Sequence, residues 1–185
     1  MILAAVGKNA TGKDYFLEYI SKKYGVPMFS IGDIARELAS KDGLEPTREN
    51  LHKTSQKYMS QFGQTFFPEQ IIKKIRESSL KKVLVSGIRP LSDVLALKEA
   101  FGNDFILVDI VISDDNVRFE RMIKRGSTRD PITIEKFKEF DEGEERIFET
   151  SKTEKLADFV VLNDGTQDDF HVAIDKFYQE HFVGK

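Results

Sequence analysis

The feature that most constrains this chain is a glycine-rich loop between an apolar run and an amphipathic one. Residues 2–6 are continuously apolar, which predicts a short strand covered on both faces. From residue 13 to 24 apolar side chains recur at helical spacing, and Gly25 is a typical helix end. The chain must therefore fold around a strand, a tight loop and a helix in that order. The loop and the start of the helix read Gly7, Lys8, Asn9, Ala10, Thr11, Gly12, Lys13 and Asp14.

The spacing of this loop, G-x-x-x-x-G-K, predicts a phosphate-binding P-loop. The glycines at 7 and 12 allow backbone N–H groups to surround a phosphate, and the helix directs its positive end at the same anion. The ammonium of Lys13 is placed to reach the β- and γ-phosphates of a nucleotide. We therefore expect residues 7–14 to bind ATP, with Lys13 also acting in catalysis.

Position 14 departs from the usual motif. Asp14 stands where a Ser or Thr hydroxyl coordinates Mg²⁺. A carboxylate beside a triphosphate is repulsive unless a cation lies between them. Asp14 is therefore a direct or water-mediated Mg²⁺ ligand, a sign that nucleotide binding has been lost, or only a favourable charge in the first helical turn.

Strand and helix patterns alternate through the rest of the chain. Apolar runs at 26–30, 82–86, 105–112 and 159–162 predict four more strands, each separated from the next by helical periodicity. This order predicts an α/β fold with a five-stranded parallel sheet and helices on both faces. Its length of 185 residues suits a single domain over 1–185. Asp109 interrupts the longest run, and we expect a buried carboxylate with satisfied hydrogen bonds.

A second anion site is predicted where the second and third strands end, because ligands bind at the carboxyl ends of parallel strands. An arginine follows each of these strands after small residues, and its planar guanidinium can hold a phosphate through two hydrogen bonds. Asp33 is either a group that orients the attacking oxygen, and a base if that oxygen is a hydroxyl, or a helix cap. The candidate acceptor residues are Ser30, Gly32, Asp33, Arg36, Gly87 and Arg89.

Composition excludes several classes of chemistry. The chain has no cysteine and three histidines far apart in sequence, which argues against disulfides, thiol catalysis and a histidine-based metal site. A net charge of −3 argues against a nucleic-acid partner. The first apolar run is too short for a signal sequence, and no stretch is long enough to cross a membrane. We expect a cytoplasmic protein with no membrane partner.

The residues after the second and third strands resemble those of nucleoside monophosphate kinases and their relatives. Ser30-x-Gly32-Asp33-x-x-Arg36 and Gly87-Ile88-Arg89 carry the likeness. It is strongest to an archaeal group of small P-loop kinases related to adenylate kinase and dephospho-CoA kinase, and extends over about residues 1–165. That group also shares Gly43-Leu44-Glu45, Glu49-Asn50-Leu51, Phe101-Gly102, Asp104-Phe105, Arg118-Phe119-Glu120-Arg121 and Lys124-Arg125-Gly126.

The resemblance implies a P-loop kinase fold with an acceptor-binding helical insert at about 31–78 and a mobile helical lid at about 115–150. It implies that Arg36 and Arg89 hold the acceptor phosphate. It also implies that lid arginines stabilise charge in the transition state, the candidates being Arg121, Arg125 and Arg129.

The chain departs from this family at two places. The third strand of the family ends Asp-Gly-Ile-Arg, whereas here Ser86 replaces the aspartate that assists Mg²⁺. The lid helix of the family reads Arg-Asp-x-Arg-Glu, whereas Phe140 and Gly143 replace both arginines. A carboxylate at 14 and a hydroxyl at 86 suggest a metal site formed by Asp14 and Ser86 with their roles exchanged.

These observations favour an ATP- and Mg²⁺-dependent kinase acting on a small phosphorylated metabolite, with a nucleoside monophosphate as first choice. One alternative is phosphorylation of a hydroxyl, either on a mevalonate phosphate, as in mevalonate-3-phosphate 5-kinases, or on dephospho-CoA. A second is an activity like that of phosphomevalonate kinases. A third is a nucleotide-binding regulator without catalysis. A GTPase switch is disfavoured because the Asn-Lys-x-Asp guanine signature is absent. The expected partners are ATP and the acceptor, with a homodimer left open.

Overall fold

The computed structural model describes residues 1–126 and 133–183. Within these residues a single sheet contains five parallel strands in the order β2-β3-β1-β4-β5, with helices packed against it. The predicted α/β fold with a parallel sheet is thereby confirmed. The strands are β1 (Ile2–Val6), β2 (Met28–Ser30), β3 (Val83–Ser86), β4 (Phe105–Val111) and β5 (Phe159–Leu162).

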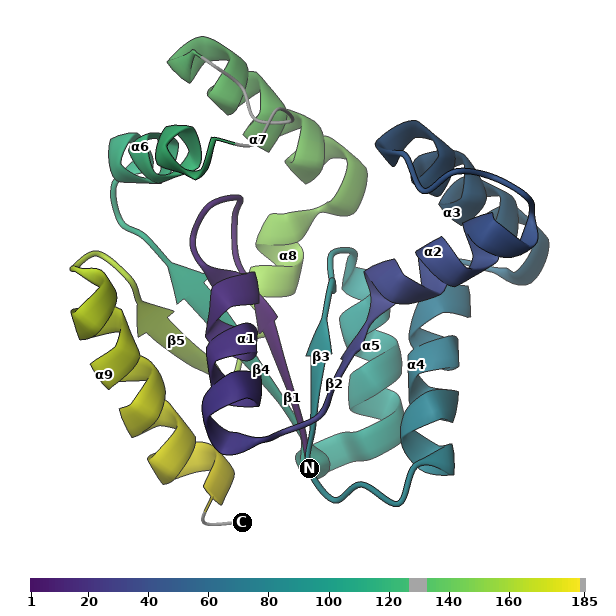
Figure 1. Ribbon diagram of the computed structural model, residues 1–185, viewed down its shortest axis with the longest axis horizontal. Helices are drawn as coiled ribbons and strands as arrows, with labels where there is room; N and C mark the ends of the chain where they lie inside the picture. Colours follow the sequence, from purple (N-terminus) through teal and green to yellow (C-terminus); the bar gives the residue numbers. More distant parts are fainter. Residues whose placement is uncertain (127–132, 184–185) are drawn as a thin grey trace.

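The helices connect successive strands and form the two outer layers (Figure 1). Four helices in the described residues begin at a side-chain cap, a residue that accepts a hydrogen bond from the backbone of the first helical turn. These caps are Thr47, Asp114, Thr133 and Thr166. The helices are α1 (Lys13–Tyr24), α2 (Ile31–Lys41), α3 (Arg48–Phe62), α4 (Phe66–Glu77), α5 (Leu91–Phe101), α6 (Asp115–Arg125), α7 (Ile134–Phe148), α8 (Thr150–Glu154) and α9 (Gln167–Phe177).

Alternation along β1 divides its side chains between two apolar cores. Ile2, Ala4 and Val6 face α2, α4 and α5, whereas Leu3 and Ala5 face α1 and α9. All five of these side chains are at most 4% exposed. Central parallel strands are covered on both faces in this way, which explains why β1 reads as an unbroken apolar run.

Two helix ends need comment. Helix α4 begins at Phe66, two residues before Pro68. Helix α7 ends at Phe148, because Glu149 adopts a left-handed conformation with φ of 50°. The chain then continues as the short helix α8, and this break turns α8 back toward the sheet.

The carboxyl ends of the strands lie at one edge of the sheet, which several helices overhang (Figure 1). Helices α6 and α7 extend above the loop after β1, and α2 and α3 lie at the same edge beyond β3. This edge is where ligands bind in parallel sheets. The described residues contain no helix that is both long and apolar enough to cross a membrane.

Candidate functional site

The loop between β1 and α1 has the backbone conformation that its glycines predict. Gly7 has a φ of +136° and Gly12 a φ of +96°, values that favour glycine. A Cβ on Gly7 would lie 2.4 Å from the Ile110 carbonyl oxygen, and one on Gly12 would lie 2.8 Å from Nδ2 of Asn163. That Nδ2 donates to the Thr11 carbonyl oxygen at 2.8 Å, so Asn163 after β5 fixes the loop. Sequence reasoning missed this residue, although its place directly after a strand was a usable signal.

Lys13 is half-buried at the start of α1. Burial lowers the pKa of its ammonium, and the positive charges of Arg89 and Arg125 act in the same direction, while Asp14 and Glu144 oppose them. Among the described residues, the recorded hydrogen bond of Nζ is a long one of 3.4 Å to the Lys8 carbonyl oxygen. A partly desolvated ammonium with so weak a partner gains energy when an anion binds beside it.

The loops after β2 and β3 lie against one another, as the predicted acceptor site requires. Ser30 and Ser86 are in register on neighbouring strands. A Cβ on Gly87 would lie 3.4 Å from the backbone nitrogen of Gly32, so the two loops are in contact. Next to them, Arg36 donates to the Asp33 carboxylate, and both side chains are more than half exposed. The structure thus brings the two loops together but leaves Asp33 and Arg36 paired at the surface.

Arg89 is held from three sides. Its Nη1 donates to Oε1 of Glu144 on α7 at 2.6 Å. Its backbone N–H donates to the carboxylate of Asp93 at 3.3 Å, and its carbonyl oxygen accepts a hydrogen bond of 3.2 Å from the Thr153 hydroxyl. Burial raises the pKa of Asp93 to about 7. The sequence did not predict these contacts of Asp93, Glu144 and Thr153. Only Asp93 could have been noticed, because it is an acidic residue in the first helical turn after Pro90.

The arginines predicted to act from the lid differ in what they contact. Arg121 donates to the carbonyl oxygens of Asn163 and Gly165 at 2.8 and 2.7 Å, so in this structure it holds the loop after β5. Arg125 lies near enough to Lys13 that its charge helps to lower the pKa of that ammonium. Arg129 lies outside the described residues. Arg118, which the family pattern includes but to which no role was assigned, is buried and donates to the Asn9 carbonyl oxygen at 3.0 Å.

A pocket lies where these groups meet. Its lining includes the P-loop and the loop after β3. Helices α7 and α8 form the opposite wall, which the sequence did not predict. This wall could not be foreseen because the left-handed Glu149 redirects the chain. The lining residues are Val6, Gly7, Lys13, Ile88, Arg89, Glu144, Thr150, Thr153 and Glu154.

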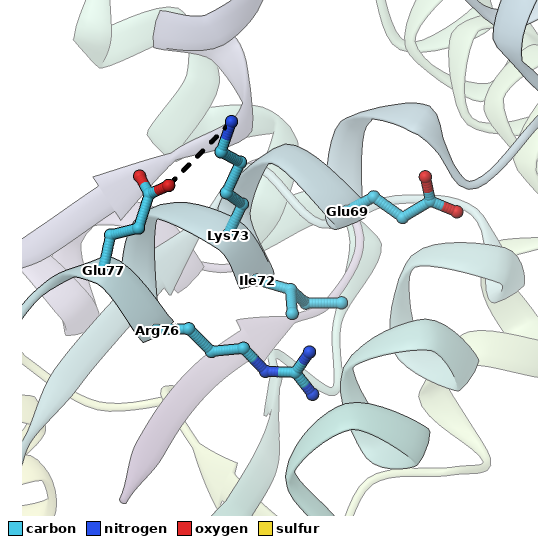
Figure 2. A pocket seen from close by; sticks show the side chains of 5 residues that line it. All are labelled: Glu69, Ile72, Lys73, Arg76 and Glu77. Atoms are coloured by element: carbon cyan, nitrogen blue, oxygen red, sulfur yellow. Dashed lines mark ion pairs between the residues drawn. The ribbon is translucent and has the colours of Figure 1, made fainter.

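A larger hollow lies along α4 and shares no residue with the P-loop (Figure 2). Its lining comes from one helix face and carries both charge signs, with Lys73 and Glu77 forming an exposed ion pair of 3.9 Å. Exposed pairs of this kind contribute little energy, and nothing in this hollow converges on a ligand. We therefore locate the candidate site at the P-loop pocket.

The predicted metal ligands follow neighbouring strands. Asp14 is exposed in the first turn after β1, whereas Ser86 ends β3 and is 9% exposed. The described residues contain no group of three or more acidic or histidine side chains arranged to hold a metal. In a nucleotide complex Mg²⁺ keeps waters and takes most other ligands from phosphates, so it would need few oxygen donors from the protein.

Asp109 corrects one expectation. Its Oδ1 is buried and lacks a hydrogen-bond partner among the described residues, so this carboxylate is not satisfied. Burial raises its pKa, and Lys8 opposes that shift. Glu154 on α8 likewise has a buried oxygen, Oε1, without a hydrogen-bond partner among the described residues.

Comparison with known proteins agrees with this geometry. A family model described as an AAA domain matches residues 6–138. A UPF0200 protein of Thermococcus onnurineus is 32% identical over 187 residues, covering 98% of this chain and all of that relative. A UPF0200/UPF0201 protein of Archaeoglobus fulgidus is 38% identical over 172 residues, and this chain spans about half its length (52%).

Solved structures share the fold at low sequence identity. A shikimate kinase from Bacteroides thetaiotaomicron has 13% identity and a TM-score of 0.59, with 97% of each chain covered. A gluconokinase from Sinorhizobium meliloti has 16% identity and a TM-score of 0.52, again with 97% of each chain covered. The family model covers more than two thirds of the chain and the Thermococcus relative matches along its whole length, so this chain belongs to the AAA-domain family and to the UPF0200 proteins.

Proposed function

We propose that this chain is an ATP-dependent phosphotransferase that transfers the γ-phosphoryl group to a small phosphorylated metabolite. The observation that carries the proposal is the convergence of Lys13 and Arg89 on one pocket beside the P-loop. Two cations on neighbouring loops suit two anions, one from the nucleotide and one from the acceptor. Phosphoryl transfer depends mainly on such positioning and charge stabilisation, and it needs no nucleophile from the protein.

In this mechanism the P-loop N–H groups and Lys13 bind the β- and γ-phosphates. Arg89 and Arg36 position the phosphate of the acceptor, with the backbone of Arg89 fixed by Asp93 and Thr153. Asp14 and Ser86 would hold Mg²⁺, which supplies neutralisation of the phosphate charge when bound. Arg125, whose charge acts on Lys13, would stabilise the charge that develops on the transferred group.

The residues carried over from the wider family keep their proposed roles here. Residues 31–78 form α2, α3 and α4, and we assign this helical insert to acceptor binding. The segment at 115–150 is the proposed lid, and Arg121 joins catalysis only if it leaves the loop after β5. Nucleoside monophosphates, the first choice from the sequence, are to be tested beside dephospho-CoA and mevalonate phosphates as acceptors.

The test is ATP consumption by the purified chain with Mg²⁺ across a panel of nucleoside monophosphates, dephospho-CoA and mevalonate phosphates. We expect turnover with at least one acceptor and a loss on the order of 10²- to 10³-fold in Lys13→Met. Lys22→Met, in the last turn of the same helix, is the matched control and should retain activity. ATP binding without turnover on any acceptor would refute the enzyme and leave a nucleotide-binding regulator.

A further inference from the structure

The wall of the pocket that faces Lys13 and Arg89 is acidic. It contains Glu144 from α7 and Glu154 from α8. Glu144 is already occupied, because it accepts the hydrogen bond of Arg89 at 2.6 Å. Glu154 is therefore the carboxylate left free for another task.

Glu154 is poorly satisfied in its surroundings. Its Oε1 is buried and has no hydrogen-bond partner among the described residues. Burial raises the pKa of this carboxyl to about 7, and the nearby carboxylates of Asp109 on β4 and Glu145 on α7 act in the same direction. The cations that oppose this shift are Lys8 in the P-loop and Arg118 on α6. A carboxyl with its pKa near neutrality exchanges a proton readily at cellular pH.

Such a group distinguishes two classes of acceptor. A phosphate oxygen attacks as an anion and needs no base, and an additional carboxylate in the pocket repels it. A hydroxyl oxygen carries a proton that must leave as the new bond forms, so it benefits from a carboxylate within the pocket. The acidic wall therefore favours a neutral attacking atom.

We propose that the attacking atom of the acceptor is a hydroxyl oxygen and that Glu154 is the catalytic base that takes its proton. This inference rests on the proposed phosphotransferase function and names the class of its acceptor. The hydroxyl oxygen bonds to the γ-phosphorus as the bond between that phosphorus and the β–γ bridging oxygen breaks. ADP leaves with the electron pair, and the hydroxyl proton moves to the Glu154 carboxylate and then to solvent.

Arg89 has a complementary role in this arrangement. When the acceptor binds, its own phosphate or carboxylate takes the place of Glu144 at the Arg89 guanidinium. Asp33 is a weaker candidate for the base, because it is paired with Arg36 and does not line this pocket. The acceptor is thus a small hydroxylated molecule with one anionic group.

The experiment follows the product by ³¹P NMR, with dephospho-CoA and mevalonate 3-phosphate as hydroxyl probes and AMP, CMP and UMP as phosphate probes. We expect a new phosphate ester with a hydroxyl probe and no new diphosphate from the monophosphates. Glu154→Gln should lower kcat by 10²- to 10⁴-fold with little change in KM for ATP, and should remove the acid limb of the kcat profile near pH 7. Glu142→Gln, an exposed position on α7, is the matched control and should leave kcat unchanged.

Glu154→Asp and a thermal unfolding curve for each variant separate loss of the base from loss of the fold. A folded Glu154→Asp that regains part of the Glu154→Gln deficit supports the assignment. Diphosphate formation from a monophosphate, or a Glu154→Gln kcat within threefold of the parent, would overturn this inference while the phosphotransferase stands. No transfer to any probe would overturn the phosphotransferase and this inference with it.

Discussion

Arg118 offers the sharpest test of how α6 and α7 are attached to the P-loop. It is 1% exposed and is the largest of the fully buried side chains in residues 1–126 and 133–183. Its guanidinium donates to Asp115 and Asp141 at 2.6 Å each and to the Asn9 carbonyl oxygen at 3.0 Å. Its centre also lies 4.8 Å from the ring centre of Phe137. One side chain thereby connects α6, α7 and the P-loop, and Arg118→Met removes all these polar contacts while it preserves much of the volume.

The structure sets the size of the effect. Breaking a buried ion pair from one side costs about 3–5 kcal/mol, because the remaining charge is left without a partner. The Asp115 side chain is 51% exposed and can return to water, whereas that of Asp141 is 19% exposed and cannot fully do so. We therefore expect the free energy of unfolding to fall by about 3 kcal/mol, near the lower end of this range. For a chain of this length that corresponds to a fall in Tm of about 6–12 °C.

The assay is urea and thermal unfolding of the parent and of Arg118→Met, followed by ATP titration of both. We also expect weaker ATP binding in the variant, since the Asn9 carbonyl loses its donor within the P-loop. Arg146→Met, at an exposed position on α7, is the control and should change stability by less than about 0.5 kcal/mol. A loss below about 1 kcal/mol for Arg118→Met would match a solvated surface pair and refute the buried connection.

Three further predictions address the rest of the site. Gly7→Ala should abolish ATP binding and destabilise the fold, because the new methyl group would lie 2.4 Å from the Ile110 carbonyl oxygen; ATP titration and urea unfolding measure both effects, and normal binding would contradict the loop geometry. Glu144→Gln should lower the acceptor KM by about two- to fivefold, since a partly exposed pair with Arg89 is worth up to about 1 kcal/mol, and a raised KM would show that Glu144 assists binding instead. Asp93→Asn should flatten the pH dependence of stability. The pKa of Asp93 is raised from 3.8 to about 7 on folding, so the native state binds the extra proton and stability falls as pH rises through that window, by at most about 1.4 kcal/mol per pH unit. Urea unfolding at pH 4.5 and 7.5 tests this, and an unchanged slope in the variant would contradict it.

Local sequence patterns were sufficient to predict those parts of the site that lie within one strand–loop–helix unit. The apolar run before Gly7 and the position of Lys13 at the start of a helix predict the P-loop, because the phosphate cradle needs only glycines, backbone N–H groups and one lysine at fixed spacing. The loops around Gly32 and Gly87 were predicted to meet because β2 and β3 end at the same edge of a parallel sheet. The contact between their backbones agrees with that reasoning.

Other residues of the site were beyond local reasoning. Arg121 occurs in a pattern that implies catalysis, yet its guanidinium holds two carbonyl groups of a loop about 40 residues away in sequence. Asp109 was expected to be satisfied, but the partner it needs is not supplied by the neighbouring strands. Whether a polar group is paired depends on which segments pack beside it, and this information is not contained in a sequence window.

The sequence by itself determined the α/β fold, the P-loop and the placement of Arg36 and Arg89 after two neighbouring strands, since each follows from periodicity, glycine placement and parallel topology. Only the tertiary structure decided what surrounds them. The left-handed turn at Glu149 directs α8 into the pocket, so that Glu154 and Thr153 line it with Lys13. An acidic wall opposite a lysine is a relation between segments far apart in the chain, and the packing of α7 and α8 over the P-loop creates it.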